Sequence, residues 1–88
     1  MQKARQTIVN TRDRPIYISV EPRPTLYELE PGETMTLLYD LPPSGDALRT
    51  DMTAEREIAV WHWQDEPEVL INGEPGHDRA WNCKHPYP

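Results

Sequence analysis

Hydrophobic and polar residues alternate along two stretches of the chain that flank the Pro31-Gly32 pair. A period of two is typical of a strand with one buried face and one wet face. Proline presets φ at about −65° in the second position of a tight turn, and glycine accepts the positive φ that the third position needs. The pattern therefore predicts two half-buried strands joined by a turn, a hairpin-like unit over 26–40. The residues on its apolar face are Tyr27, Leu29, Met35, Leu37 and Tyr39.

The same alternation predicts short strands along the rest of the chain. It is clearest where Ile16, Ile18 and Val20 alternate with more polar neighbours. Asn72-Gly73 is a hairpin turn signal, because both residues tolerate positive φ. We expect strands over 7–10, 16–21, 47–52, 58–64, 69–71 and 79–84, a loop over 41–46, and flexible tails at 1–5 and 86–88.

One segment, 46–57, is compatible with two structures. Leu48, Thr50 and Met52 alternate as in a strand, and we favour a strand over 47–52 with a loop to Arg56. The alternative is a short helix within 46–57, which would begin at a capping Asp46 in the longest proline-free stretch of the chain. Little or no helix is expected elsewhere.

Composition agrees with an all-β chain of modest core. Hydrophobic residues make up 36% of the 88 residues, phenylalanine is absent, and ten residues are proline. Proline is about twice as frequent as usual, and it is excluded from helix interiors and from central strands. We predict a single domain, 1–88, folded as a compact antiparallel β-sandwich of about seven short strands.

Several turn residues also support a resemblance to known domains. Asn10 is followed by Pro15, then by Glu21-Pro22, and then by Leu29-Glu30-Pro31-Gly32-Glu33. This arrangement resembles small bacterial all-β domains to which no function has been assigned. The Leu-x-Pro-Gly-Glu turn is also similar to turns of immunoglobulin-like and cupredoxin-like sandwiches. The resemblance covers about 8–40 and implies one of these two topologies, but it carries over no active site.

Charge is distributed unevenly along the chain. Residues 1–14 have a net charge of +3 and the remaining residues a net charge of −9, which gives −6 in total. An acidic body repels phosphate backbones, so no nucleic-acid partner is expected. The single cysteine, Cys83, cannot form an intramolecular disulfide, and no signal peptide is recognisable, so we expect a cytoplasmic protein. No segment is apolar over the length needed to span a membrane, and no membrane partner is expected.

Metal-ligand residue types gather in one place, near the C-terminal end. On the predicted final strand, Cys83 and His85 would share one face, about 7 Å apart along the strand. This separation is wide for two ligands of one ion, so no metal site and no cofactor are expected. The alternative is a small metal-binding domain that uses Cys83 and His85 together with His77.

Catalytic motifs with a defined spacing are missing from the sequence. Paired carboxylates such as Glu28 and Glu30 fit an ordinary solvated strand face, and any triad assembled from Cys83 and a histidine would rest on composition alone. We therefore expect no enzymatic activity, no catalytic residues and no cofactor-binding residues. The sequence identifies no small-molecule ligand.

The segment Ile58–Trp63 is apolar on both faces. Ile58 and Val60 form one apolar face, and Ala59, Trp61 and Trp63 form the other. If the chain covers both faces itself, the indoles lie in the core and Trp81 or Tyr87 covers the rest. If it does not, the second face is an aromatic patch for a protein partner or a second copy of the chain, because tryptophan is enriched in interface hot spots. We favour a non-enzymatic protein-binding or assembly module whose partner-binding residues are Trp61, His62 and Trp63.

Overall fold

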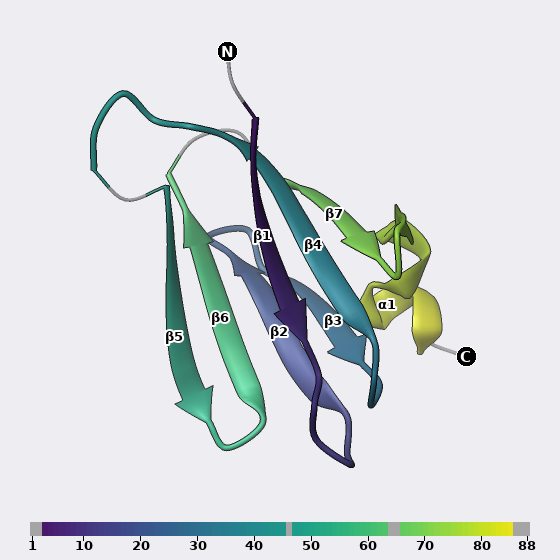
Figure 1. Cartoon of the computed structure of the whole chain (residues 1–88). Helices are drawn as coiled ribbons and strands as arrows, with labels where there is room; N and C mark the ends of the chain where they lie inside the picture. The colour runs from purple at the N-terminus through teal and green to yellow at the C-terminus, as the bar shows by residue number, and fades with distance from the viewer. Residues whose placement is uncertain (1–2, 46, 64–65, 86–88) are drawn as a thin grey trace.

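The protein is all-β, with two four-stranded sheets packed against each other (Figure 1). The computed structural model describes residues 3–45, 47–63 and 66–85. Within these residues the strands are β1 (Lys3–Val9), β2 (Ile16–Glu21), β3 (Thr25–Leu29), β4 (Thr34–Asp40), β5 (Leu48–Ala54), β6 (Glu57–His62), β7 (Glu68–Ile71) and β8 (Glu74–Pro75). A 3-10 turn, η1 (His77–Arg79), and a short helix, α1 (Trp81–Lys84), follow β8.

Sheet A has the strand order β1-β4-β7-β8, and sheet B has the order β3-β2-β6-β5. Most neighbouring strands are antiparallel, but β2 and β6 pair in parallel, with Ile18 opposite Ile58 and Val20 opposite Val60. The prediction of a purely antiparallel arrangement is therefore wrong for sheet B. The parallel pair arises because β5 runs opposite to β2 and the chain reverses between β5 and β6, so β6 lies beside β2 in the same direction.

The strands around Pro31-Gly32 exist, but they do not form a hairpin. β3 pairs with β2 in sheet B, whereas β4 pairs with β1 and β7 in sheet A, so the turn crosses from one sheet to the other. Gly32 adopts the positive φ of 83° that was expected. The turn is held by the end of β1 instead, because Gly32 N donates to Asn10 O at 2.8 Å and Asn10 N donates to Glu33 O at 3.0 Å.

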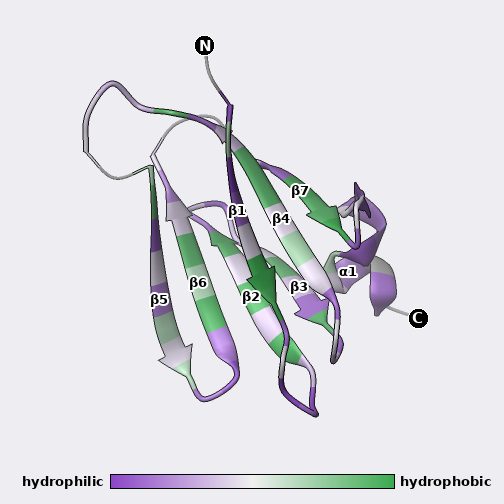
Figure 2. Ribbon diagram, in the orientation of Figure 1, coloured by the Kyte–Doolittle hydropathy of each residue, from purple (hydrophilic) through white to green (hydrophobic). Residues whose placement is uncertain are grey.

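The core lies between the sheets and draws on both of them. Its buried members follow the predicted alternation and appear as green bands on the strands in Figure 2. Because β3 and β4 approach the core from opposite sides, the faces predicted for 26–40 are correct although the pairing is not. The core residues are Ile16, Ile18, Val20, Tyr27, Leu29, Met35, Leu37, Val60 and Ile71.

The N-terminal part of the chain is ordered in the sheet earlier than expected. β1 begins at Lys3 and pairs with β4 through Lys3 opposite Asp40, so a flexible tail over 1–5 and a first strand confined to 7–10 are both wrong for the described residues. Lys3 Nζ lies 2.9 Å from Asp40 Oδ1. The pairing follows from the length of β4, which offers backbone partners along all of β1. Residues 1–2 and 86–88 lie outside the described residues.

The ambiguous segment is a strand, and the helix is elsewhere. β5 spans Leu48–Ala54 as the edge strand of sheet B, which confirms the strand over 47–52 and overturns the helix within 46–57; Asp46 lies outside the described residues. The strand predicted over 79–84 is wrong. Only Ala80 bridges to the sheet, opposite Tyr27, and residues 81–84 are helical. This turn of helix forms because Trp81 and Lys84 bind side chains on the outer face of sheet B, as described below.

Asn72 and Gly73 form the predicted hairpin turn. Both have positive φ, 54° and 83°, and they join β7 to the short β8. Of the helices among the described residues, none has the length and apolar character to cross a membrane.

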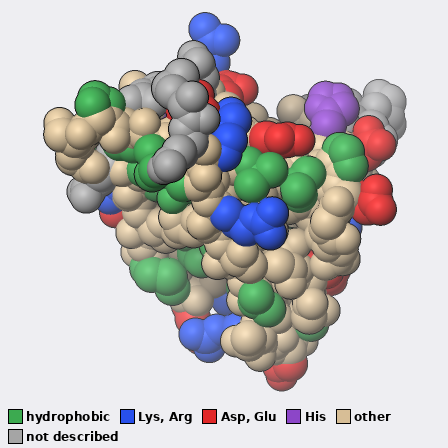
Figure 3. All heavy atoms as spheres, turned by 45° about the horizontal axis from the view of Figure 1, so that its top comes forward, with side chains coloured by type: hydrophobic (Ala, Val, Ile, Leu, Met, Phe, Trp, Pro, Cys, Tyr) green, Lys and Arg blue, Asp and Glu red, His purple; other side chains and the backbone are tan. Residues whose placement is uncertain are grey.

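One side of the molecule is open because the sheets are offset. β5 extends past β1, the edge strand of sheet A, as Figure 1 shows. Met52, which shares the core-facing side of β5 with Leu48, is consequently 66% exposed. Figure 3 shows the end with the 40–47 loop, where hydrophobic side chains lie in small groups between charged ones.

Candidate functional site: the outer face of sheet B

The register of β6 decides which of its side chains reach the core. Ile58 and Val60 lie opposite Ile18 and Val20 of β2 and face inward. Ala59 and Trp61 alternate with them and therefore face outward, on the side of sheet B that is turned away from sheet A. The expectation that the chain is apolar on both faces of this strand is correct, and the indole of Trp61 is not part of the core.

Half of this outer face is covered by the C-terminal segment. Trp81 of α1 packs edge-on against Tyr17 of β2, with ring centroids 6.0 Å apart. The His85 ring packs on the Trp81 ring, with ring centroids 3.9 Å apart. We call Tyr17, Glu28, Trp81, Lys84 and His85 the covered half.

Ion pairs fasten this cover to the sheet. Lys84 Nζ donates to Glu28 Oε1 at 2.8 Å and lies 3.4 Å from Glu30 Oε1. His85 Nε2 lies 3.5 Å from the same Glu28 oxygen. The Glu28 side chain is only 12% exposed, so its bond with Lys84 is shielded from water more than an ordinary surface pair is.

A second ion pair secures the segment just before α1. Arg79 Nη2 donates to Glu33 Oε1 at 2.6 Å. Glu33 also accepts from Glu30 N at 2.8 Å and from Asn72 Nδ2 at 3.2 Å, so it joins the Pro31-Gly32 turn to the Asn72-Gly73 turn. These contacts leave the C-terminal segment with two charged anchors, one on each side of Ala80.

The two anchoring carboxylates have lowered pKa values. The hydrogen bond from Lys84 lowers the pKa of Glu28, and burial opposes this effect only in part. The hydrogen bond from Arg79 likewise lowers the pKa of Glu33. A carboxyl group with a lowered pKa is ionised at neutral pH and is poorly suited to act as a general acid. Both groups are therefore anchors in this arrangement.

The other half of the outer face carries no such cover from the described residues. Trp61 lies opposite Arg49 of β5 and Glu21 of β2. The Arg49 guanidinium lies over the Trp61 ring, 5.4 Å from its centroid, and pairs with Asp51 at 3.0 Å. A guanidinium over an indole face is a favourable cation–π geometry. We call Arg49, Asp51, Trp61 and Trp63 the open half.

Trp63 follows the end of β6 and is 58% exposed. The indole of Trp63 therefore does not lie in the core, contrary to the first of the two alternatives for this segment. His62 behaves differently from its neighbours, because it lies opposite Leu48, on the core-facing side of the strand, and is half-buried. Three residues were predicted to bind a partner. Of these, Trp61 lies on the outer face of sheet B, Trp63 is exposed to solvent two residues later, and His62 lies on the core-facing side.

The metal-ligand residues near the C-terminal end are not arranged as a strand would arrange them. His77 lies in η1, Cys83 in α1, and His85 directly after α1 against Trp81 and Glu28. The Cys83 side chain lies outside the described residues. Among the residues that are described, no group of three or more His, Cys, Asp or Glu side chains is placed to hold a metal ion.

The residues that divide the face in two were missed by the sequence analysis. Arg49 is far from Trp61 in the sequence and Tyr17 is far from Trp81; the register of β5 on β6 brings the first pair together, and the packing of α1 on β2 brings the second pair together. The one available signal was the high aromatic content of 58–63 and of 81–87. It indicated that aromatic side chains cover part of the sheet, but it did not indicate which part. Comparison of the chain with protein-family models, with curated proteins and with solved structures gave no match.

Proposed function

We propose that this chain is a non-enzymatic, cytoplasmic protein-binding module, and that its partner docks on the open half of sheet B. The observation that carries the proposal is the 58% exposure of Trp63, two residues after the outward-facing Trp61. Indole rings bury about 150–250 Å² each when they are covered. Exposed rings of this size are costly on a monomer and are typical of interfaces.

The chemistry of the open half favours a protein as the partner. Tryptophan and arginine are the residue types that most often dominate protein interfaces, and Trp61 and Arg49 already stack on each other. Arg49 is preoriented by Asp51, so little side-chain freedom is lost when a partner covers it. A different protein fits better than a second copy, because two identical chains of net charge −6 repel each other.

The test begins with a peptide-display selection against the immobilised domain, followed by affinity measurement for each enriched peptide. Trp63→Ala should weaken binding by about 30-fold, the effect of losing a hot-spot side chain. The fold should stay intact, because an exposed side chain contributes little to stability. Leu41→Ala is the matched control, since Leu41 is another exposed large apolar residue, and it should bind like the parent chain.

Two outcomes would contradict the proposal. Enriched peptides that bind Trp63→Ala and Trp61→Ala as tightly as the parent would place the binding surface elsewhere. A stable dimer at micromolar concentration that dissociates on Trp63→Ala would replace the heterologous partner with a second copy of the chain. Sedimentation of the parent and the variant separates this case from the first.

A further inference from the structure

Three arginines that form no ion pair lie together at one end of the molecule. Lys3, Arg49, Arg79 and Lys84 each form an ion pair. Arg12, Arg14 and Arg56 form no ion pair within the described part of the chain; Arg5 and Arg23 form none either, but they do not lie with these three. In a chain of net charge −6, with an excess of carboxylates available, three unpaired guanidiniums in one place indicate a site for an anion.

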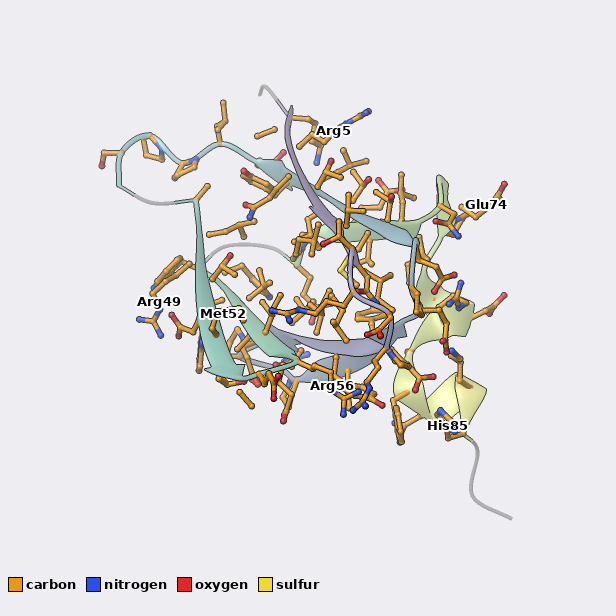
Figure 4. The ribbon with its side chains drawn as sticks, turned by 60° about the horizontal axis from the view of Figure 1, so that its bottom comes forward. Arg5, Arg49, Met52, Arg56, Glu74 and His85 are labelled. Atoms are coloured by element: carbon orange, nitrogen blue, oxygen red, sulfur yellow. The ribbon has the colours of Figure 1, made fainter. Side chains whose placement is uncertain are left out.

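These three arginines line one pocket. The pocket has a volume of about 340 Å³ and is completed by Asp13 and Glu55. Its walls are the connection between β1 and β2 and the turn between β5 and β6. In Figure 4, where this end comes forward, Arg56 lies at the β5–β6 turn and Arg5 lies toward the other end of β1.

The wall that carries Arg12 and Arg14 is held in a fixed shape by Asn10, which is 1% exposed. The Asn10 amide donates to Arg14 O at 2.8 Å and to Leu29 O at 2.9 Å, and its oxygen accepts from Arg12 N at 2.9 Å. A buried side chain with all these bonds fixes the backbone on both sides of Asp13. The two guanidiniums therefore start from a preorganised loop.

Arg56 lies on the other wall and is tied to the first by two contacts. Its backbone oxygen accepts from Tyr17 N at 2.9 Å, and its Nη1 lies 3.4 Å from Pro15 O. The long second contact is a weak hydrogen bond, so most of the guanidinium's donors remain available for a ligand.

A smaller apolar pocket continues from the charged one. It has a volume of about 130 Å³, shares Arg12, Glu55 and Arg56 with its neighbour, and is lined by apolar side chains of both sheets. It exists because β5 extends past β1 and leaves the sheets uncovered on this side. The volume equals roughly four water molecules at about 30 Å³ each, which is the size of one aliphatic side chain. The apolar residues are Ile8, Val9, Ile16, Met52 and Ile58.

We infer that this pair of pockets binds a carboxylate that carries a branched aliphatic group, either a free short-chain acid or the terminal leucine-like residue of a protein chain. The guanidiniums of Arg12, Arg14 and Arg56 receive the carboxylate, and the aliphatic group enters the slot beside Met52. Three guanidiniums and two carboxylates leave the charged lining with a net charge of +1. This balance matches a monoanion, whereas a phosphate dianion would face Asp13 and Glu55 with excess negative charge.

The site is separate from the proposed protein-binding face. Met52 and Ile58 lie on the core-facing side of sheet B, and Trp61 lies on its outer side. Failure of one proposal therefore leaves the other intact.

The experiment adds each candidate ligand to the isotope-labelled protein and monitors the amide chemical shifts. N-acetyl-leucine should bind in the millimolar range, as expected for about a dozen heavy atoms, with shifts concentrated at residues 10–16 and 52–58. N-acetyl-leucinamide, which has the same side chain without the carboxylate, should bind at least tenfold more weakly. Binding by 4-methylpentanoate as well would identify a free acid as sufficient, and binding by N-acetyl-leucine alone would indicate a chain terminus.

Variants locate the two parts of the site. Arg56→Gln and Arg14→Gln should each weaken N-acetyl-leucine binding about tenfold, and Arg5→Gln, an equal loss of charge elsewhere on the chain, should not change it. Met52→Gln should weaken N-acetyl-leucine but not acetate. Equal binding of acid and amide, tighter binding of inorganic phosphate, or unchanged affinity in both arginine variants would overturn the inference. Preserved amide dispersion in each variant establishes that the fold is unchanged.

Discussion

The two halves of the outer face of sheet B are built from similar residue types, but one is covered by the C-terminal segment and the other is exposed. In the covered half, an indole from α1 lies on Tyr17 and a partly buried ion pair joins Lys84 to Glu28. In the open half, the indole of Trp61 carries only an arginine from its neighbouring strand. Both halves present an aromatic ring and a cation, so residue type does not distinguish them. The difference is whether a segment of the chain reaches that part of the face.

The reach of the C-terminal segment follows from where it is anchored. Ala80 bridges to Tyr27 on β3, which is the edge strand farthest from β5. Arg79 is tied to Glu33 just before this point, and Lys84 to Glu28 just after it. A single turn of helix advances only about 6 Å, so α1 covers β3 and β2 and stops short of β6. The open half therefore remains uncovered because the C-terminal segment is short and is anchored at β3.

The largest expected effect that separates the halves is on stability. Trp81→Ala should lower the free energy of unfolding by about 2 kcal/mol, because it removes a half-buried ring and uncovers Tyr17. Trp63→Ala should lower it by less than about 0.5 kcal/mol, since the ring is already in water. Urea unfolding of both variants measures the difference. Equal losses in the two variants would mean that the halves are not distinct.

A second, smaller effect should appear in acid, at the two carboxylates that anchor the C-terminal segment. The pKa values of Glu28 and Glu33 are lowered in the folded protein, so their contribution to stability is complete above the unfolded value near 4.5. It is lost as the pH falls below that value and through the lower folded pKa of each group. Urea unfolding measured between pH 7 and pH 3 should therefore show a free energy of unfolding that declines below about pH 5.

The matched variants make this effect specific. Glu28→Gln and Glu33→Gln should each be less stable at pH 7 and show a flatter acid decline, whereas Asp51→Asn, in the open half, should keep the decline of the parent. An acid decline that is unchanged in both glutamine variants would contradict the assignment of these residues as anchors.

The comparison also shows what the sequence could and could not predict. Alternation located most of the strands, because a half-buried strand must alternate whichever partner it pairs with. Alternation does not predict which strands pair. Leu29 and Met35 would be equally buried whether β3 and β4 belonged to one sheet or to two sheets that face each other. The Pro31-Gly32 turn was therefore recognised, while its crossing between the sheets was not.

The wrong strand prediction near the C-terminal end has a similar cause. Residues 81–84 lack the length and the apolar periodicity of a stable helix, and the helical turn is held by contacts to Tyr17 and Glu28 that are more than 50 residues distant. Arg12, Arg14 and Arg56 could not be grouped either, because only the parallel pairing of β2 with β6, which sets Tyr17 opposite Glu57, brings their two loops together. The aromatic segment 58–63 was located correctly, because its composition alone required cover on two faces.

The smallest expected effect tests the cation–π contact that defines the open half. Arg49→Ala should cost only about 0.5–1 kcal/mol of stability, because an exposed guanidinium gains little from either Trp61 or Asp51. Asp51→Ala removes the ion pair alone, so the difference between the two variants reports on the ring contact. A double-mutant cycle of Arg49→Ala with Trp61→Leu should give a coupling of about 0.5 kcal/mol at low salt. Coupling of this size, with affinity for a selected peptide reduced in both single variants, is expected if Arg49 and Trp61 form one binding surface. A coupling near zero, with Arg49→Ala leaving peptide affinity unchanged, would restrict the surface to Trp63 and remove Arg49 from it.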